Sequence, residues 1–296
     1  MPTLTNDHAN TTAEADADHG DAGVAPGRLL YLAEATHEAR KLETPLGLVA
    51  VASAQTTDED HVNEDAAAVY GLADGSLLLV LADGAGGMPA GRAAAAIAIE
   101  SLAPGPEHAP SREHVVHAFE TANRRVIELG VGAASTLIAA ELSPDRRLRT
   151  YHAGDSVASL VGQRGKLKAQ TIAHNPTAYA VEAGYMTEAE SHLHEDRATL
   201  SNCLGLEDMR IEIGSPTAIA PRDTLLLATD GVTDNLTTDE IIHAVRMGPL
   251  DAAAQTLLRR ARERMTNPSL QEGDEGPAHP SKPDDATVVL FRLKRG

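Results

Sequence analysis

The chain has 296 residues, of which 42% are hydrophobic, and it carries a formal net charge of −18. This acidic balance argues against a nucleic-acid-binding protein, because phosphate backbones are held by clustered lysine and arginine. The single cysteine, Cys203, excludes an intramolecular disulfide and a cysteine-rich zinc site, and it favours a reducing compartment, the cytoplasm.

The first 27 residues are rich in Ala, Asp, Thr and Gly and contain no Lys or Arg. Such a segment, without a periodic apolar face, predicts a disordered acidic tail over residues 1–27, followed by one domain over residues 28–296. It lacks the positive region of a signal peptide, and no apolar run in the chain reaches the length of a membrane span. We therefore expect no membrane association.

The next segments predict a short helix and then β-structure. A helix is expected over Leu29–Ala39 and a strand over Gly47–Ala54. The runs Ala66–Ala73 and Ser76–Asp83 are joined by Asp74-Gly75, a dipeptide that strongly favours a β-hairpin between such segments.

Helices are expected after the glycine-rich turn that follows Asp83, at residues 92–102 and 111–129, where composition and apolar spacing are helical. The rest of the chain predicts short strands at 135–142, 148–154, 156–162, 166–172, 223–230 and 286–293, with helices near 238–246 and 251–264. Short strands separated by tight turns imply antiparallel sheets, so the fold class is α+β.

Carboxylates recur at the predicted strand ends, beside glycines or other acids. They lie in Asn63-Glu64-Asp65, Asp83-Gly84, Gly154-Asp155, Asp230-Gly231 and Asp284-Asp285. One such pair alone is usually an ordinary turn, as Asp74-Gly75 is, but five acidic strand ends can converge on one point of a rigid scaffold. Carboxylate oxygens suit Mg²⁺ or Mn²⁺, and no His/Cys zinc spacing occurs.

These segments resemble the motifs of the metal-dependent protein phosphatase family, PPM or protein phosphatase 2C, in its bacterial form. The resemblance runs from about Leu48 to Leu293. It is carried, in order, by NED (residues 63–65), ADGAGGMPAG (82–91), GAASTLIAAEL with YHAGDSVASLV (132–142 and 151–161), ATDGVTDN (228–235) and DDATVV (284–289).

The resemblance implies a four-layer αββα sandwich of two antiparallel β-sheets flanked by helices, with two Mg²⁺ or Mn²⁺ ions at one edge. Asp83, as the bridge between the ions, and Asp65 would be catalytic. The implied metal ligands are Glu64, Asp65, Asp83, the Gly84 carbonyl, Asp230 and Asp284, and a third, weaker ion is implied at Asp155, Asp230 and Asp234. A metal-activated water would then hydrolyse phosphoserine or phosphothreonine in proteins, including substrates of a Ser/Thr kinase. We expect a monomer.

Residues 174–205 resemble the family's flap, a segment beside the catalytic edge. The resemblance assigns substrate access to His174, Asn175, Glu182 and Gly184. The flap histidines are read as solvated loop side chains rather than as metal ligands, since no partner spacing supports a site at His174, His192 or His194.

Two positions depart from the family pattern. Asp60 stands where the family places an arginine that grips the substrate phosphate, and Val157 replaces another arginine. Arg92, Arg197 and Lys282 could substitute, although each is read as a solvated surface charge. Two alternatives therefore stay open: a catalytically weakened regulatory or phosphoprotein-binding module, and a hydrolase of small phosphate esters.

Overall fold

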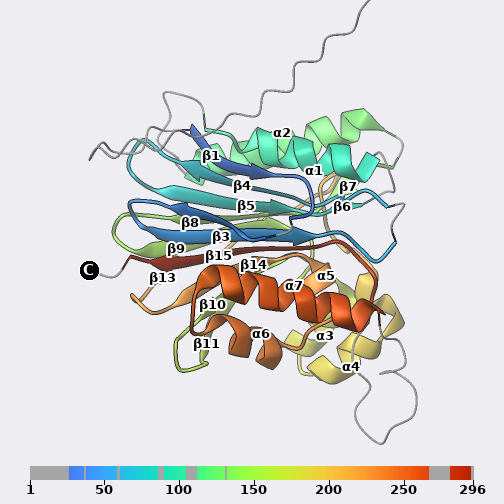
Figure 1. The fold of residues 1–296 in the computed structure, drawn as a ribbon. Helices are drawn as coiled ribbons and strands as arrows, with labels where there is room; N and C mark the ends of the chain where they lie inside the picture. The colour runs from blue at the N-terminus through green and yellow to red at the C-terminus, as the bar shows by residue number, and fades with distance from the viewer. Residues whose placement is uncertain are drawn as a thin grey trace, which may run out of the picture.

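Two antiparallel β-sheets lie face to face at the centre of the molecule, and helices cover both outer faces (Figure 1). This computed structural model describes residues 27–36, 38–58, 61–85, 90–104, 112–130, 132–266 and 281–294. The four-layer αββα sandwich expected from the resemblance is confirmed.

The first sheet has the order β1-β4-β5-β8-β9-β12, with β13 also paired to β9. Its strands are β1 (Gly27–Leu32), β4 (Ala66–Gly71), β5 (Leu77–Ala82), β8 (Leu137–Leu142), β9 (Arg147–Ala153), β12 (Glu212–Ile213) and β13 (Thr217–Ala218). The second sheet has the order β11-β10-β14-β15-β3-β2. Its strands are β2 (Arg40–Glu43), β3 (Gly47–Ala54), β10 (Val157–Val161), β11 (Leu167–Gln170), β14 (Thr224–Ala228) and β15 (Ala286–Leu293).

The helices form the outer layers. Helices α1 (Ala90–Ser101) and α2 (Arg112–Leu129) cover the first sheet, whereas α5 (Asp230–Thr233), α6 (Thr238–Val245) and α7 (Leu250–Thr266) lie on the second. A small ribbon of β6 (Gly84–Ala85) and β7 (Ala134–Ser135) continues beyond the first sheet. Helices α3 (Pro176–Glu182) and α4 (Glu188–Leu193) and the 3₁₀ helix η1 (Glu195–Ala198) make up the flap.

The apolar runs of the sequence reflect strands that are covered on both faces. Along β5, Leu79 and Leu81 point into the core between the sheets, while Leu78 and Val80 pack under α1 and α2. Side chains alternate between the two faces of a strand, so a strand buried on both sides is apolar throughout. This explains the uninterrupted run LLLVLA that ends just before Asp83.

The predicted hairpin at Asp74-Gly75 is confirmed, and its geometry explains both residues. Gly75 has a φ of +82°, which favours glycine, and Asp74 Oδ1 accepts a hydrogen bond from Ser76 N at 2.9 Å. The resulting register pairs Ala66 with Ala82.

The helix predicted over Leu29–Ala39 is wrong. Residues 27–32 form β1, which pairs with β4 so that Tyr31 lies opposite Ala68. Pairing covers what would otherwise be an open edge of β4, and this tertiary gain outweighs local helix preference. Gly27 already belongs to β1, while residues 1–26 and the position of Asp60 lie outside the described residues, so the division into tail and domain stays a prediction.

Candidate metal centre

Strand register brings the predicted carboxylates to one edge of the sandwich. Because Ala66 pairs with Ala82, Asp65 precedes β4 directly beside the point where Asp83 follows β5. In the second sheet Val157 pairs with Ala228, which places Asp155 and Asp230 in the same way.

The electrostatics show that these carboxylates lie close together. Burial raises the pKa of Asp83 well above its usual range, and the charges of Asp65, Asp230, Asp284 and Asp155 raise it further, in that order. Burial and then Asp230 likewise raise the pKa of Asp284 to about 6. Carboxylates this close cannot all be ionised without nearby cations.

The same holds at the implied third site. Burial, followed by the charges of Asp230 and Asp234, raises the pKa of Asp155. Burial and then Asp230 raise the pKa of Asp234 to about 6. Asp155 and Asp234 therefore share one electrostatic cluster with Asp230 in this structure.

Several oxygens of the cluster are buried without a hydrogen-bond donor. Glu64 Oε1, Asp65 Oδ1 and Asp230 Oδ1 have no hydrogen-bond partner among the described residues. Asp65 is only 2% exposed, so bulk solvent hardly reaches its carboxylate. Unpaired carboxylate oxygens that converge in this way fit a hard divalent cation such as Mg²⁺ or Mn²⁺.

Glycines let the backbone and the Glu64 carboxylate approach closely. A Cβ on Gly91 would lie 2.8 Å from the Glu64 carboxylate, and a Cβ on Gly84 would lie 2.2 Å from Gly91 O. The Glu64 side chain therefore rests against the first turn of α1, where the partial positive charge of a helix N-terminus favours it. These close approaches explain why positions 84 and 91 are glycines.

Hydrogen bonds with two threonines hold Asp65 and Asp83 in place. Thr229 Oγ1 donates to Asp65 Oδ2 at 3.0 Å and accepts from Thr287 N at 2.9 Å. Asp83 N donates to Thr136 Oγ1 at 3.0 Å. Neither Thr229 nor Thr136 was assigned a role from the sequence. Thr229 directly precedes Asp230, which is a local signal, whereas Thr136 has no acidic neighbour in the sequence.

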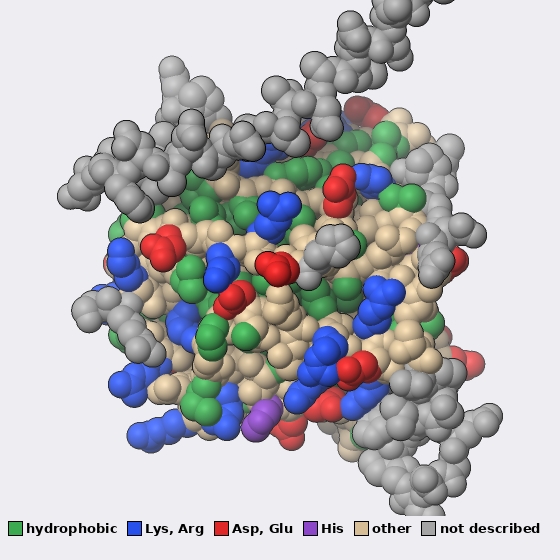
Figure 2. All heavy atoms as spheres, in the orientation of Figure 1, with side chains coloured by type: hydrophobic (Ala, Val, Ile, Leu, Met, Phe, Trp, Pro, Cys, Tyr) green, Lys and Arg blue, Asp and Glu red, His purple; other side chains and the backbone are tan. Residues whose placement is uncertain are grey.

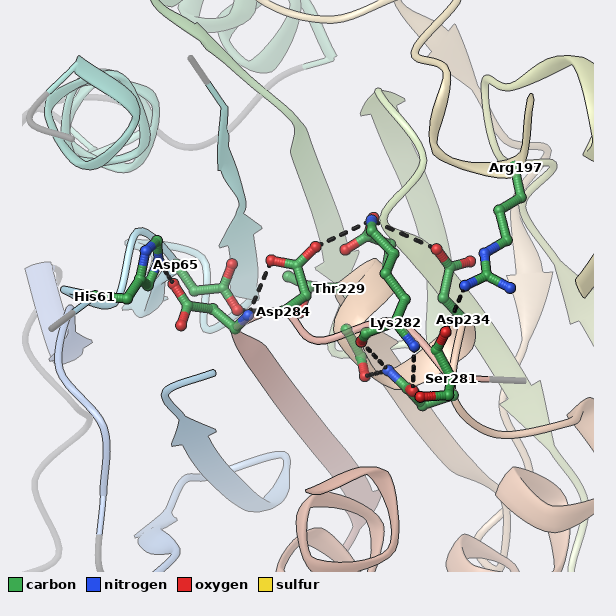
Figure 3. A network of polar contacts seen from close by, with 12 residues as sticks. His61, Asp65, Arg197, Thr229, Asp234, Ser281, Lys282 and Asp284 are labelled. Atoms are coloured by element: carbon green, nitrogen blue, oxygen red, sulfur yellow. Dashed lines mark hydrogen bonds and ion pairs between the residues drawn. The ribbon is translucent and has the colours of Figure 1, made fainter. Parts of the chain in front are cut away.

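Asp285, next to Asp284, holds neighbouring segments together. Its carboxylate accepts hydrogen bonds from Thr56 N at 2.8 Å and Glu64 N at 2.7 Å, and it pairs with His61 Nε2 at 3.0 Å (Figure 3). It thereby ties the start of β15 to the segment that carries Glu64. Sequence reasoning had noted this acid only as part of Asp284-Asp285.

Lys282 lies inside the acidic cluster rather than on the surface. Its Nζ forms an ion pair with Asp230 Oδ2, and it lies 3.0 Å from Asp284 Oδ2 and 3.5 Å from Asp234 Oδ2 (Figure 3). The prediction that Lys282 is a solvated surface charge is therefore wrong. Asp284 is a near neighbour of Lys282 in the sequence, whereas Asp230 and Asp234 come from the distant segment around α5, and no local pattern reveals that contact.

The other two candidate replacements for the missing arginines differ from each other. Arg92 is exposed on α1, as expected. Arg197 is only partly exposed and donates from Nη2 to Ser281 O at 2.6 Å, so its assignment as a solvated charge is wrong. Val157 is buried at the start of β10, where an apolar side chain fits the core.

His174 also departs from the prediction that it is a solvated loop residue. It is 4% exposed and its ring stacks on that of His152, with centroids 4.3 Å apart. Its Nδ1 lies 3.1 Å from Gly154 N and 2.8 Å from Asn202 Nδ2, both donors, so the ring proton is on Nε2, which faces Glu212 Oε2 at 3.2 Å.

His152, His174 and Glu212 do lie within metal-ligand spacing of one another. Neither nitrogen of His174 offers a lone pair to an ion, however, because Nδ1 accepts two donors and Nε2 carries the proton. The two histidine rings are therefore a buried stacked pair, and His174 is hydrogen-bonded to the exposed Glu212. Of the other flap histidines, His192 has a side chain only 10% exposed and His194 one that is 39% exposed.

The flap lies against the second sheet beside the acidic edge (Figure 1). Asn175 caps α3 by accepting from Ala178 N at 2.7 Å, and Gly184, with a φ of +74°, follows the end of that helix. Glu182 is exposed and lines a cavity of about 330 Å³ between the flap and the sheet, which Asp234 also lines. The flap therefore adjoins the centre, while the role of these residues in substrate access stays a prediction.

The fold and the acidic edge together define a class of protein, the metal-dependent phosphatases. The chain belongs to the protein phosphatase 2C family, which it matches over residues 54–272. Over the described residues, no helix is both long and apolar enough to cross a membrane.

Relatives and solved structures agree with this assignment. The chain is 30% identical over 210 residues to the serine/threonine protein phosphatase PstP of Mycobacterium tuberculosis, a match that covers 67% of this chain but only 39% of that protein. It is 28% identical over 227 residues to protein phosphatase PhpP of Streptococcus pneumoniae, covering 72% of this chain and 89% of that one. The crystal structure of the PstP catalytic domain with two manganese ions superposes with a TM-score of 0.64 at 24% identity, covering 83% and 98% of the two chains.

Proposed function

We propose that this chain hydrolyses phosphoserine and phosphothreonine in proteins with two Mg²⁺ or Mn²⁺ ions held at the acidic edge. The convergence of Asp65, Asp83 and Asp230 carries this proposal, together with the buried, unpaired oxygens of Glu64, Asp65 and Asp230. It is supported by the PstP catalytic domain, which has the same fold and holds two manganese ions.

Each predicted ligand has a place in this scheme. Asp83 would bridge the ions, with Glu64, Asp65 and the Gly84 carbonyl on one side and Asp230 and Asp284 on the other. Asp155 and Asp234, with Asp230, would hold a third ion. When bound, the ions would supply an activated water and balance the charge of the phosphoryl group.

The protein's own contribution is to fix these carboxylates before substrate arrives. Thr229 orients Asp65 through a hydrogen bond, and Thr136 binds the backbone of Asp83. Rigid strand ends with supporting hydrogen bonds hold ligands more accurately than loops do. No observation on the described residues favours the binding-module or small-ester alternatives.

We also propose the substrates, the oligomeric state and the cellular location of this protein. The substrates would be phosphorylated proteins, including those of a Ser/Thr kinase, and the protein would act as a monomer. The buried, single Cys203 fits a cytoplasmic location, because no disulfide within the chain can form.

The test is Mn²⁺-dependent hydrolysis of p-nitrophenyl phosphate and of a phosphothreonine peptide. Wild-type protein should hydrolyse both, and Asp83→Asn should lose more than about 100-fold in turnover because one residue serves both ions. Asp155→Ala should lose less and recover at high Mn²⁺. Wild-type protein that binds Mn²⁺ but releases no phosphate from either substrate would contradict the proposed enzyme.

A further inference from the structure

The Lys282 ammonium occupies the part of the acidic edge that the proposed function assigns to one metal ion. It contacts Asp230 and Asp284, the two proposed ligands of that ion, and also Asp234 (Figure 3). A lysine side chain is an ammonium cation at neutral pH, and this one faces three carboxylates.

The backbone of Lys282 is fixed by its neighbours. Its N–H donates to Asn235 Oδ1 at 2.8 Å, and its carbonyl accepts from Asn235 Nδ2 at 2.8 Å. Asn235 is fully buried, and the adjoining Ser281 carbonyl accepts from Arg197. The backbone position of the lysine is thus set by its hydrogen bonds to Asn235, while its flexible four-carbon side chain is held by the three carboxylates.

An ammonium and a divalent ion cannot both bond to the same carboxylate oxygens. Lys282 pairs with one oxygen of Asp230 and one oxygen of Asp284. Its positive charge balances the negative charge that a metal ion would otherwise balance. Among the described residues, no Lys or Arg ion pair is found at Glu64, Asp65 or Asp83, whereas Lys282 pairs with Asp230 and Asp284.

We propose that Lys282 is a tethered cation that competes with the divalent ion for Asp230 and Asp284. This inference rests on the proposed function. Metal loading at this site is then a displacement in which the ammonium leaves the two carboxylates. The two ions consequently load unequally: the site at Asp65 and Asp83 fills first, and the site at Asp230 and Asp284 fills only at higher metal concentration.

The experiment is titration of the metal-free full chain with Mn²⁺ alone, followed by calorimetry and by electron paramagnetic resonance of free Mn²⁺. Lys282→Met removes the charge and keeps an unbranched side chain, so the weaker of the two Mn²⁺ dissociation constants should fall roughly tenfold while the tighter one stays unchanged. Lys282→Arg keeps a cation and should retain the weak second site.

Lys168→Met is the matched control. Lys168 Nζ pairs with Asp223 Oδ2 at 2.6 Å, at the opposite end of β14 from Asp230. This variant also loses one lysine and one partly buried ion pair, and both Mn²⁺ affinities should stay at the wild-type values. Lys282→Gln carries the same expectation as Lys282→Met and replaces it if the Met variant does not fold.

The outcomes separate this inference from the proposed function. Two Mn²⁺ ions bound with the same affinities by wild type and Lys282→Met, or a weaker second ion in the variant, would overturn the role of Lys282 and leave the metal centre intact. No Mn²⁺ bound by either protein would overturn the metal centre, and with it both proposals.

Discussion

At the scale of single residues, Asp284 and Asp285 show how adjacent acids take different roles. Asp284 faces Lys282 and the acidic edge. Asp285 is 3% exposed, and both of its carboxylate oxygens accept hydrogen bonds from backbone N–H groups. Glu64 N and Asp285 lie 221 positions apart in the sequence. This link makes Asp285 a structural support of the centre rather than a ligand.

Asp285→Ala should destabilise the metal-free protein by about 2–4 kcal/mol, because it leaves the N–H groups of Glu64 and Thr56 without an acceptor. The measurement is urea unfolding in the presence of EDTA. Asp74→Ala is the control, since Asp74 also accepts a backbone N–H but lies in an exposed turn. Equal losses in the two variants would show that Asp285 does not support the edge.

The sequence brings Asp83 and Asp230 to strand ends, and the structure places both there, while their role as metal ligands stays a prediction. Asp83 follows an apolar run and Asp230 follows another, so local pattern and register suffice to place them. Lys282 and His174 were misjudged because their surroundings come from segments that are distant in sequence. Pairing of Lys282 with Asp230, 52 positions away, has no local signature.

At the scale of elements, the long strands and helices were predictable and the short ones were not. The strands over Gly47–Ala54 and Ala286–Leu293 have the predicted bounds. The two-residue strands β6, β7, β12 and β13 carry no periodic pattern, because only their pairing partners define them. Strand β1 has six residues, and its pairing with β4 rather than its local sequence makes it a strand.

The flap is attached to the body by few contacts. Glu188 Oε1 on α4 accepts from Thr238 N at the start of α6, at 2.7 Å, and Arg197 reaches Ser281. The hydrogen bond with His192, and then the bonds from Thr238, lower the pKa of Glu188 from 4.5 to about 2. An element held by few bonds opens locally at lower cost than the sheets do.

Glu188→Gln should speed hydrogen exchange of flap amides over residues 176–198 by roughly fivefold at neutral pH and leave the sheets unchanged. Because the pKa of Glu188 is lower in the folded protein, its stabilisation is present above pH 4.5 and is lost as the pH falls toward 2. The difference between the two proteins should therefore shrink in acid.

Glu182→Gln provides the control, because Glu182 is an exposed flap carboxylate with no hydrogen bond or ion pair found in the described part of the chain. Faster exchange in the Glu182 variant, or no change on replacing Glu188, would mean that α4 is not held through Thr238.

At the scale of the whole molecule, the negative charge is distributed unevenly. On the face in Figure 2, acidic and basic side chains are interspersed and do not form a single acidic patch. The buried edge, by contrast, concentrates Asp65, Asp83, Asp155 and Asp230 with one lysine nearby. Repulsion between like charges lowers the stability of the metal-free fold. This loss is expected where the fold holds metal ligands in position before the metal binds.

Mn²⁺ at about 100 times its dissociation constant should raise the unfolding midpoint by roughly 5–10 °C, because binding to the folded state alone adds about 2.7 kcal/mol.

Asp83→Asn should change the unfolding midpoint both with and without Mn²⁺. It should lose most of the Mn²⁺-dependent rise, and in EDTA it should unfold at a higher temperature than wild type, because one of the buried like charges is gone. Asp208→Asn removes an equal charge from an exposed position and should change neither midpoint. A lower midpoint for Asp83→Asn in EDTA would show that the acidic edge is not strained by repulsion, and that its carboxylates are balanced without metal.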